Sequence, residues 1–365
     1  MLPSVAAVLE DDDLLAKILL RLPPQPSSLP RASAVSKSWR SLVSNPAFSR
    51  RFRIHHRRNP PLLGCFIIHR HELRFQPTLD PPNRLPEDRF PFPIHGFTLL
   101  GCRHGFLLML RTSQGTLELL VWDPVNGHEH PIAIPPGFGV KSLINGAVLR
   151  AAHGDINHFQ VVLVSTNVER RAIACVYSSE TGEWGNAIST PLPLNASNLS
   201  LGVIDPLKPA VLVGDSLYIL LLGKSSGIIE FDVRRQSLAV IPLPLDSNSS
   251  RYYSVMRAEG GGLGLLFLST SDGSAQLWKW KTDCDGGASW VLGRTIELDK
   301  LLLSPKLKNP GSLQIQGIAE ENNVVLLWSY VGVFMVQLDS LQLKKLPGIS
   351  FIRSYPFECV YAAGI

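Results

Sequence analysis

The chain has 365 residues, of which 45% are hydrophobic and 18% are charged, so it can bury a large core and is not wholly disordered. Its 29 glycines and 28 prolines favour many short strands joined by turns over long helices. The net charge of +5 is uneven: residues 1–58 carry ten Lys/Arg and four acids, whereas the remainder carries 25 basic and 26 acidic residues. The basic character therefore belongs to the N-terminal segment and is no guide to the partners of the whole protein.

Residues 9–53 have helical periodicity. Acids at 11–13 favour the positive end of a helix dipole, and apolar residues then follow at spacings of three and four. Pro23 ends this helix, a second helix is predicted over 29–36, and a third begins near Lys37. Three helices of this size bury too little surface to be stable alone, so a partner or the rest of the chain must complete their apolar faces.

The order of residues in this segment resembles the F-box. Leu22-Pro23 is followed by the stretch 36–40 (SKSWR) and then by 45–48 (NPAF), an order that is specific when complete. The resemblance implies an F-box domain over 9–53 that docks on a Skp-type adaptor, and through it on a cullin. An amphipathic head of this kind suits recognition of a helix face by a groove. The alternative is that the same face packs on the downstream domain.

The predicted adaptor contacts share an apolar character and lie on the predicted helices or at their ends. They are Leu14, Leu15, Ile18, Leu19, Leu22, Pro23, Leu29, Val35, Trp39 and Leu42.

Residues 54–61 are predicted as a basic linker. Arg57 and Arg58 lie in it, and further arginines precede it. Aromatic residues among these basic ones are limited to Phe48 and Phe52, so a solvated joint that can also face an acidic partner is favoured over nucleic-acid binding.

From residue 62 the periodicity is that of strands. Polar turns follow apolar strands at residues 123, 178, 232, 285 and 339, in steps of 53 to 55. A period of this length with about four strands is typical of propeller blades and is near the kelch length of about 50. Six blades are predicted, with five or seven left open. The sixth pairs strands just after residue 62 with one around 358–362, which removes exposed sheet edges.

This layout resembles the propeller-like F-box-associated domain that follows the F-box in many plant proteins. The expected fold is thus an α+β multidomain chain: a three-helix head over 9–53, then an all-β propeller of about six kelch-like blades over 62–365.

The residues of catalytic and metal sites are not found in recognisable patterns. No nucleophile elbow or phosphate loop is present, and the pairs His69/His71 and His128/His130 lack neighbouring cysteines or convergent carboxylates. No cofactor and no metal are therefore expected. The five cysteines are far apart, with Cys284 in a turn and the others expected in the core.

The cysteine spacing favours a reducing compartment, and the chain is expected in the cytoplasm, the nucleus or both. The longest uncharged run, residues 322–338, is too short and too polar for a membrane span.

The combined expectation is a non-catalytic substrate-recognition subunit of an SCF-type ubiquitin ligase. The head docks on the adaptor, and the propeller holds a protein substrate for ubiquitination. The substrate-binding residues stay unknown, because the sequences of the loops that would form the binding surface do not identify a substrate. Two alternatives stay open: a propeller-fold hydrolase that acts in the central channel, and a non-degradative scaffold that binds the adaptor.

Overall fold

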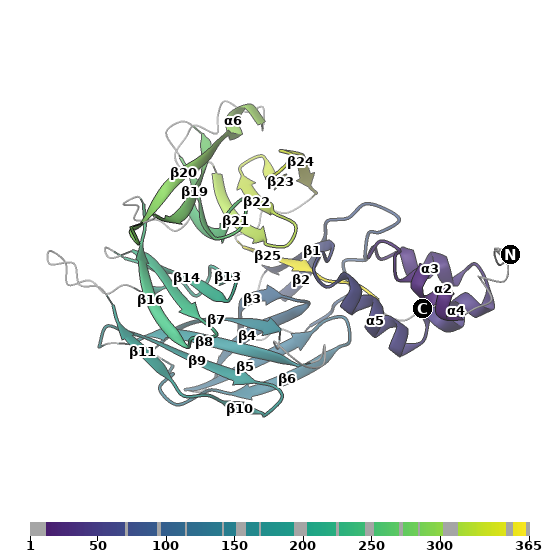
Figure 1. Ribbon diagram of the computed structural model, residues 1–365, viewed down its shortest axis with the longest axis horizontal. Coiled ribbons are helices and arrows are strands. Elements are labelled where there is room, and N and C mark those ends of the chain that lie inside the picture. The colour runs from purple at the N-terminus through teal and green to yellow at the C-terminus, as the bar shows by residue number, and fades with distance from the viewer. Residues whose placement is uncertain are drawn as a thin grey trace.

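The computed structural model shows a lobe of helices beside a ring of strands (Figure 1). The structure describes residues 12–69, 72–92, 96–113, 115–140, 142–150, 158–167, 169–192, 203–223, 226–244, 252–269, 273–283, 285–301, 313–347 and 353–362. None of the helices in these ranges has the length and hydropathy that a membrane crossing requires.

From residue 12 on, the described part of the head contains four helices: α2 (Asp12–Leu19), α3 (Ser28–Ser33), α4 (Lys37–Val43) and α5 (Pro46–His56). The prediction of three helices is therefore one short. Asn45-Pro46 ends α4, and it also starts α5. The Asn45 side chain accepts a hydrogen bond from the Ala47 N–H at 2.8 Å, and proline is favourable in a first helical turn. The last turn of α5 thus extends into the segment predicted as a linker.

The strands follow in chain order. They are β1 (Leu62–His69), β2 (Glu72–Pro77), β3 (Phe97–Arg103), β4 (Phe106–Ser113), β5 (Thr116–Asp123), β6 (His128–Ala133), β7 (Leu143–Arg150), β8 (Phe159–Thr166), β9 (Arg171–Ser178), β10 (Glu183–Trp184), β11 (Ile188–Pro191), β12 (Val203–Ile204), β13 (Val211–Val213), β14 (Ser216–Leu222), β15 (Gly227–Asp232), β16 (Ser237–Pro242), β17 (Tyr253–Arg257), β18 (Leu263–Leu268), β19 (Ser274–Thr282), β20 (Ala288–Glu297), β21 (Leu313–Ala319), β22 (Val324–Ser329), β23 (Gly332–Gln337), β24 (Leu343–Leu346) and β25 (Ser354–Glu358). A short helix, α6 (Leu298–Leu301), follows β20.

These strands form six sheets, which are the blades of a six-bladed propeller. Blade A combines β2, β1 and β25, and blades B to F are built from β3–β6, β7–β11, β12–β16, β17–β20 and β21–β24. The five turn markers at 123, 178, 232, 285 and 339 all lie where the third strand of a blade leads into its outer strand or strands. Their regular spacing therefore reported the blade period, and the prediction of six blades is confirmed.

The ring closes as predicted, through pairing between segments that are far apart in the sequence. β25 is antiparallel to β1, with Tyr355 opposite Phe66. The closing strand lies at Ser354–Glu358, earlier than the predicted 358–362, because Val360 packs against the helices of the head.

The core of the propeller lies between neighbouring blades. At the closure, the rings of Phe66, Phe75, Phe90 and Phe357 form one cluster with centroids 4.9 to 6.2 Å apart. Indole hydrogen bonds add polar links between blades. Trp184 of blade C donates to the Ala133 carbonyl of blade B, and Trp290 of blade E donates to the Pro242 carbonyl of blade D, both at 2.7 Å.

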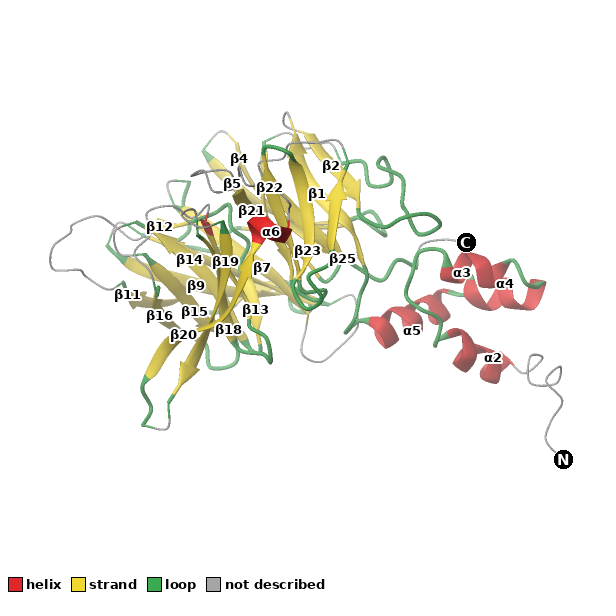
Figure 2. Cartoon of the chain, turned by 90° about the horizontal axis from the view of Figure 1, so that it is seen from above, coloured by secondary structure: helices red, strands yellow, loops and turns green. Residues whose placement is uncertain are grey.

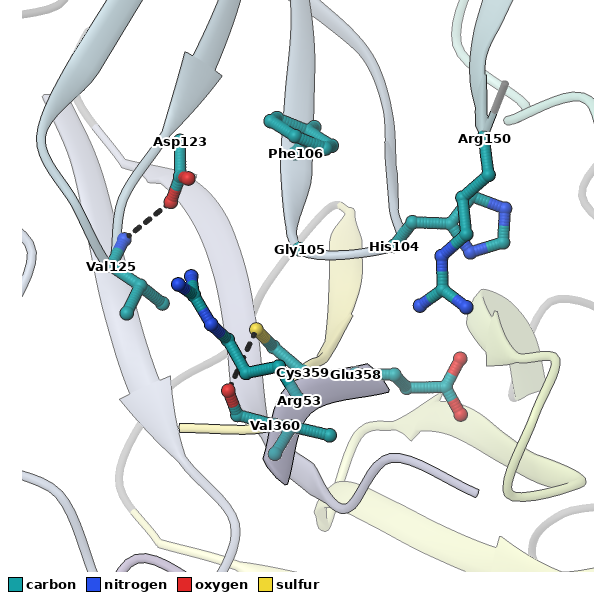
Figure 3. A pocket seen from close by; sticks show the side chains of 10 residues that line it. All are labelled: Arg53, His104, Gly105, Phe106, Asp123, Val125, Arg150, Glu358, Cys359 and Val360. Carbon is teal, nitrogen blue, oxygen red and sulfur yellow. Dashed lines mark hydrogen bonds between the residues drawn. The ribbon is translucent and has the colours of Figure 1, made fainter. Parts of the chain in front are cut away.

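The head lies to one side of the ring, next to the end of β25 (Figure 2), and α5 shares a cavity with the β3–β4 and β5–β6 turns of blade B (Figure 3). This head-facing side carries the β3–β4 turn at His104 and the β5–β6 turn after Asp123.

Candidate functional site

Helix α2 has two apolar faces with different roles. Leu15 and Leu19 are 0% exposed and pack inward, whereas Leu14 and Ile18 are 37% and 41% exposed. The latter two are four residues apart, so they lie on the same outer face of the helix. An amphipathic helix normally keeps polar residues on its solvent side. The outer face of α2, defined as Leu14 and Ile18, is therefore a candidate contact surface.

The ten predicted adaptor contacts divide by exposure. Leu15, Leu19 and Leu29 are buried in the head's own core, and their contact with an adaptor stays a prediction. Leu22, Trp39 and Leu42 are partly buried against that core, while Leu14, Ile18, Pro23 and Val35 are exposed, Val35 by 63%.

The chain itself completes the inner core of the head. Phe48 and Phe52 of α5 cover the inward leucines, and Val360, which follows β25, joins the same cluster. Of the two expected alternatives, the rest of the chain therefore completes the inner apolar face of the head, and the outer face of α2 is left exposed. The side chains of Leu14 and Ile18 are partly exposed in this fold and are therefore accessible to a partner.

Several contacts fix the head to the propeller. The amide oxygen of Asn83, in the loop after β2, accepts hydrogen bonds from the N–H and the hydroxyl of Ser27, at 3.1 and 2.7 Å, at the start of α3. Arg150 at the end of β7 donates to the Arg57 carbonyl at 3.0 Å. These hydrogen bonds, together with the packing of Val360 in the head core, fix the orientation of the head relative to the propeller.

The central channel is filled by residues 205–210 of blade D, which interrupt its inner strand between β12 and β13. Asn145 of blade C donates to the carbonyls of Asp205 and Lys208, both at 2.7 Å. Arg103 of blade B donates to the Ala210 carbonyl at 2.8 Å, and Lys208 reaches the Ile315 carbonyl of blade F at 3.3 Å. The segment thus bridges three other blades.

Small cavities lie around Arg103. The two cavities that Arg103 lines measure about 20 and 30 Å³, enough for one or two water molecules. Arg103 and Glu320 form an ion pair between blades B and F. Burial nevertheless raises the pKa of Glu320 to about 6, because desolvation outweighs the attraction of Arg103. The described part of the channel thus contains a polar joint between blades B, C, D and F.

Among the residues that the structure describes, no group of three or more His, Cys, Asp or Glu side chains is placed to hold a metal ion. His128 and His130 are exposed on β6. The side chain of His69, residue 71 and residue 284 lie outside the described residues. Cys65 and Cys175 are buried, but Cys102 and Cys359 are partly exposed, since each lines a cavity on the head-facing side.

Sequence reasoning missed three residues that shape this site: Asn45, Asn83 and Val360. The signal for Asn45 was present, because Asn followed by Pro favours a helix start as well as a helix end. Asn83 and Val360 act across long sequence separations, and a local pattern carries no trace of such contacts.

Comparisons with known proteins agree with this architecture. Residues 11–51 match the F-box domain, and residues 98–362 match the family described as "F-box protein AT5G49610-like, beta-propeller". No curated protein matches the chain.

Among solved structures, AofleA from Arthrobotrys oligospora is 14% identical with a TM-score of 0.40, over 71% of this chain and 74% of that one. The SapL1 lectin in complex with alpha methyl fucoside is 11% identical with a TM-score of 0.41, over 80% and 99%. Likeness at this level supports no argument about ligands. The two domain matches cover most of the sequence, and the chain belongs to the F-box proteins that carry a C-terminal β-propeller of this family.

Proposed function

We propose that this chain is the substrate-recognition subunit of an SCF-type E3 ubiquitin ligase. An F-box joined to a β-propeller is the architecture of an F-box substrate receptor, and the F-box implies binding to a Skp-type adaptor. The adaptor would connect the chain to a cullin, and the propeller would hold a protein substrate. The complex would act in the cytoplasm, the nucleus or both.

The exposed outer face of α2 is the observation that supports this proposal most directly. Leu14 and Ile18 remain in water although the head has closed its own core. Full burial of an exposed side chain of this kind is worth roughly 1.5–3 kcal/mol, and a partner would cover the parts of Leu14 and Ile18 that are still exposed, 37% and 41%. Partly buried Trp39 and Leu42 and exposed Val35 could add further contact area.

In this proposal the chain contributes proximity and no nucleophile. The firm mounting of the head would hold a bound substrate in one position relative to the adaptor, which raises its effective concentration at a recruited conjugating enzyme.

Co-purification tests the docking step. The double variant Leu14→Asp, Ile18→Asp should lose most of its co-purification with a co-expressed Skp-type adaptor, because two charges would be buried in the interface. The matched control is Val291→Asp, Leu292→Asp on β20, whose side chains are 41% and 45% exposed on the propeller. Equal recovery of the adaptor with both double variants would refute docking through the outer face of α2.

A reconstituted ubiquitination assay tests the step beyond docking. The parent complex should modify proteins captured by the propeller, and the docking-deficient double variant should not. Adaptor binding without any ubiquitin transfer would favour the non-degradative scaffold. Hydrolytic activity of the chain in the absence of the adaptor would favour the propeller-fold hydrolase.

A further inference from the structure

The outer strand of blade E is longer than the outer strands of the other blades. β20 has ten residues, whereas β2, β6, β10, β11, β16 and β24 have two to six. It also projects beyond its own blade, because β18 pairs with β19 only up to Lys279, whereas β19 and β20 continue to Thr282 and Ala288 (Figure 2). Among the described residues β20 pairs only with β19, so its other edge has no strand beside it.

Most of the other outer strands carry features that hinder further strand pairing. Four of them contain a proline, namely Pro77 in β2, Pro131 in β6, Pro191 in β11 and Pro242 in β16. β10 has only two residues, and β24 has four, of which two are lysines. Short strands, prolines and lysines are the means by which natural proteins protect sheet edges.

β20 lacks these features over its first half. It contains no proline, and residues 288–293 (ASWVLG) carry no charge. Its one irregularity of pairing falls near Gly293, so residues 288–292 pair regularly with 278–282. Every second residue of such a strand directs its backbone N–H and C=O away from the paired neighbour. The segment 288–292, the open edge of blade E, can therefore pair with one more strand.

One face of the open edge is aromatic and apolar. Trp290 lies opposite Trp280, with ring centroids 5.3 Å apart, and Leu292 lies opposite Trp278. Side chains alternate along a strand, so these four share one face. Trp290 is held in place by its hydrogen bond to the Pro242 carbonyl, while Leu292 is 45% exposed. This face suits apolar side chains.

The opposite face of the open edge is basic. Val291 lies opposite Lys279, and Ser289 lies opposite Lys281. Lys279 has a counterion, because Glu259 lies 3.7 Å from its ammonium. Lys281 is exposed and makes no ion pair in the described part of the chain. Since serine is small, a carboxylate placed beside Ser289 would lie within reach of the flexible lysine stem.

We propose that the open edge of blade E receives an extended segment of another protein as an added strand, in which apolar residues alternate with acidic ones. The backbone of this segment would bond to β20, with its apolar side chains beside Trp290 and Leu292 and its acidic side chains on the face of Lys281. The inference rests on the proposed function only in calling this protein a substrate, since the head takes no part in the contact.

A second copy of the chain fits this edge less well. Antiparallel pairing of two β20 strands keeps like faces on the same side, so it would bring the Lys281 side chains of both copies onto one face. Like charges on one face of a sheet are unfavourable, whereas an acidic segment complements them.

Titration calorimetry of the full chain with an acetylated heptapeptide of alternating valine and glutamate tests this proposal. The parent should bind the peptide saturably, and Val291→Asp, Leu292→Asp should weaken binding by about tenfold or more, because it removes apolar contacts and adds like charge. Leu343→Asp is the matched control on another outer strand, β24, where the side chain is 37% exposed, and it should bind as the parent does. Because no adaptor is present, a failure of adaptor docking would not affect this result. Absence of saturable binding by the parent would overturn the proposal.

Modified peptides test strand addition on the unaltered protein, even if the aspartate variant fails to fold. N-methylation of every second residue removes either the N–H groups that face β20 or those that face solvent, depending on which alternate set is methylated. One methylated peptide should lose binding, and the other should keep it. Equal affinities of the two methylated peptides would overturn strand addition.

A charge exchange tests the basic face. The parent should prefer the valine–glutamate peptide to a valine–lysine peptide, and Lys281→Glu should reverse this preference. Equal binding of both peptides by the parent would overturn the acidic preference. Self-association of the parent, measured by sedimentation and abolished by Val291→Asp, Leu292→Asp, would assign the edge to a second copy and overturn the proposal.

Discussion

The head and the propeller reach stability in different ways. Each propeller blade packs on two neighbours, and β25 closes the ring so that no inner strand is left without an adjacent blade. The head has a single small core, whose last position is filled by Val360 from the far end of the ring. Exposed apolar side chains occur in both parts: Leu14 and Ile18 on the outer face of α2 are 37% and 41% exposed, and Val291 and Leu292 on β20 are 41% and 45% exposed. The outer face of α2 is thus the apolar surface of this helix that stays exposed after α5 and Val360 have covered its inner face.

The largest expected effect concerns ring closure. Phe357 is 0% exposed, and its ring contacts Phe66, Phe75 and Phe90. Phe357→Ala should lower the free energy of unfolding by about 3–5 kcal/mol, because it leaves a cavity where β25 joins β1. Urea unfolding followed by tryptophan fluorescence measures this loss. Tyr330→Ala, at a side chain that is 48% exposed, is the control and should stay within about 0.5 kcal/mol of the parent. An equal loss of unfolding free energy in the two variants would contradict the importance of Phe357 for ring closure.

The next effect separates the two faces of α2. Leu19→Ala should destabilise the head by about 2–5 kcal/mol, and Leu14→Ala on the same helix should have little effect on stability. Proteolysis of the head at increasing urea concentration measures the difference. In the adaptor assay, Leu14→Ala should weaken adaptor binding more than Leu19→Ala does, at urea concentrations where both variants stay folded. A stability loss at Leu14 as large as that at Leu19 would contradict the division into inner and outer faces.

The smallest effect depends on pH and lies at the junction. Burial lowers the pKa of His104 well below its usual 6.5, and the charges of Arg150 and Arg103 lower it further. The native state thus favours neutral His104, so its contribution to stability is present above pH 6.5 and is lost as the pH falls toward the native pKa.

His104→Asn should remove this acid sensitivity, at up to about 1.4 kcal/mol for each pH unit below 6.5. Asparagine tolerates the positive φ of 56° at this position, so the turn should survive. Urea unfolding of parent and variant at several pH values between 5 and 8 measures the effect. A stability difference between parent and variant that does not change with pH would contradict the assignment to His104.

The sequence predicted the propeller well because its signal is repeated. The turns at Asp123, Ser178 and Asp232 mark the same junction in successive blades, so one misread turn would not have hidden the period. The F-box assignment rested on an ordered string of residues. The division of the leucines in α2 could not be predicted, because the apolar pattern covers more than one face and α5 and Val360 decide which face is buried. The channel segment 205–210 was missed for a related reason: its contacts lie on three other blades.

The position of Val360 has a consequence for synthesis. A ribosome makes the F-box helices first, yet their core lacks one wall, and the ring lacks β25, until translation has passed residue 360. Chains that stop early would carry an unfinished head as well as an open ring. Such fragments should compete poorly for the adaptor, so the fold itself favours full-length receptors over truncated ones during assembly.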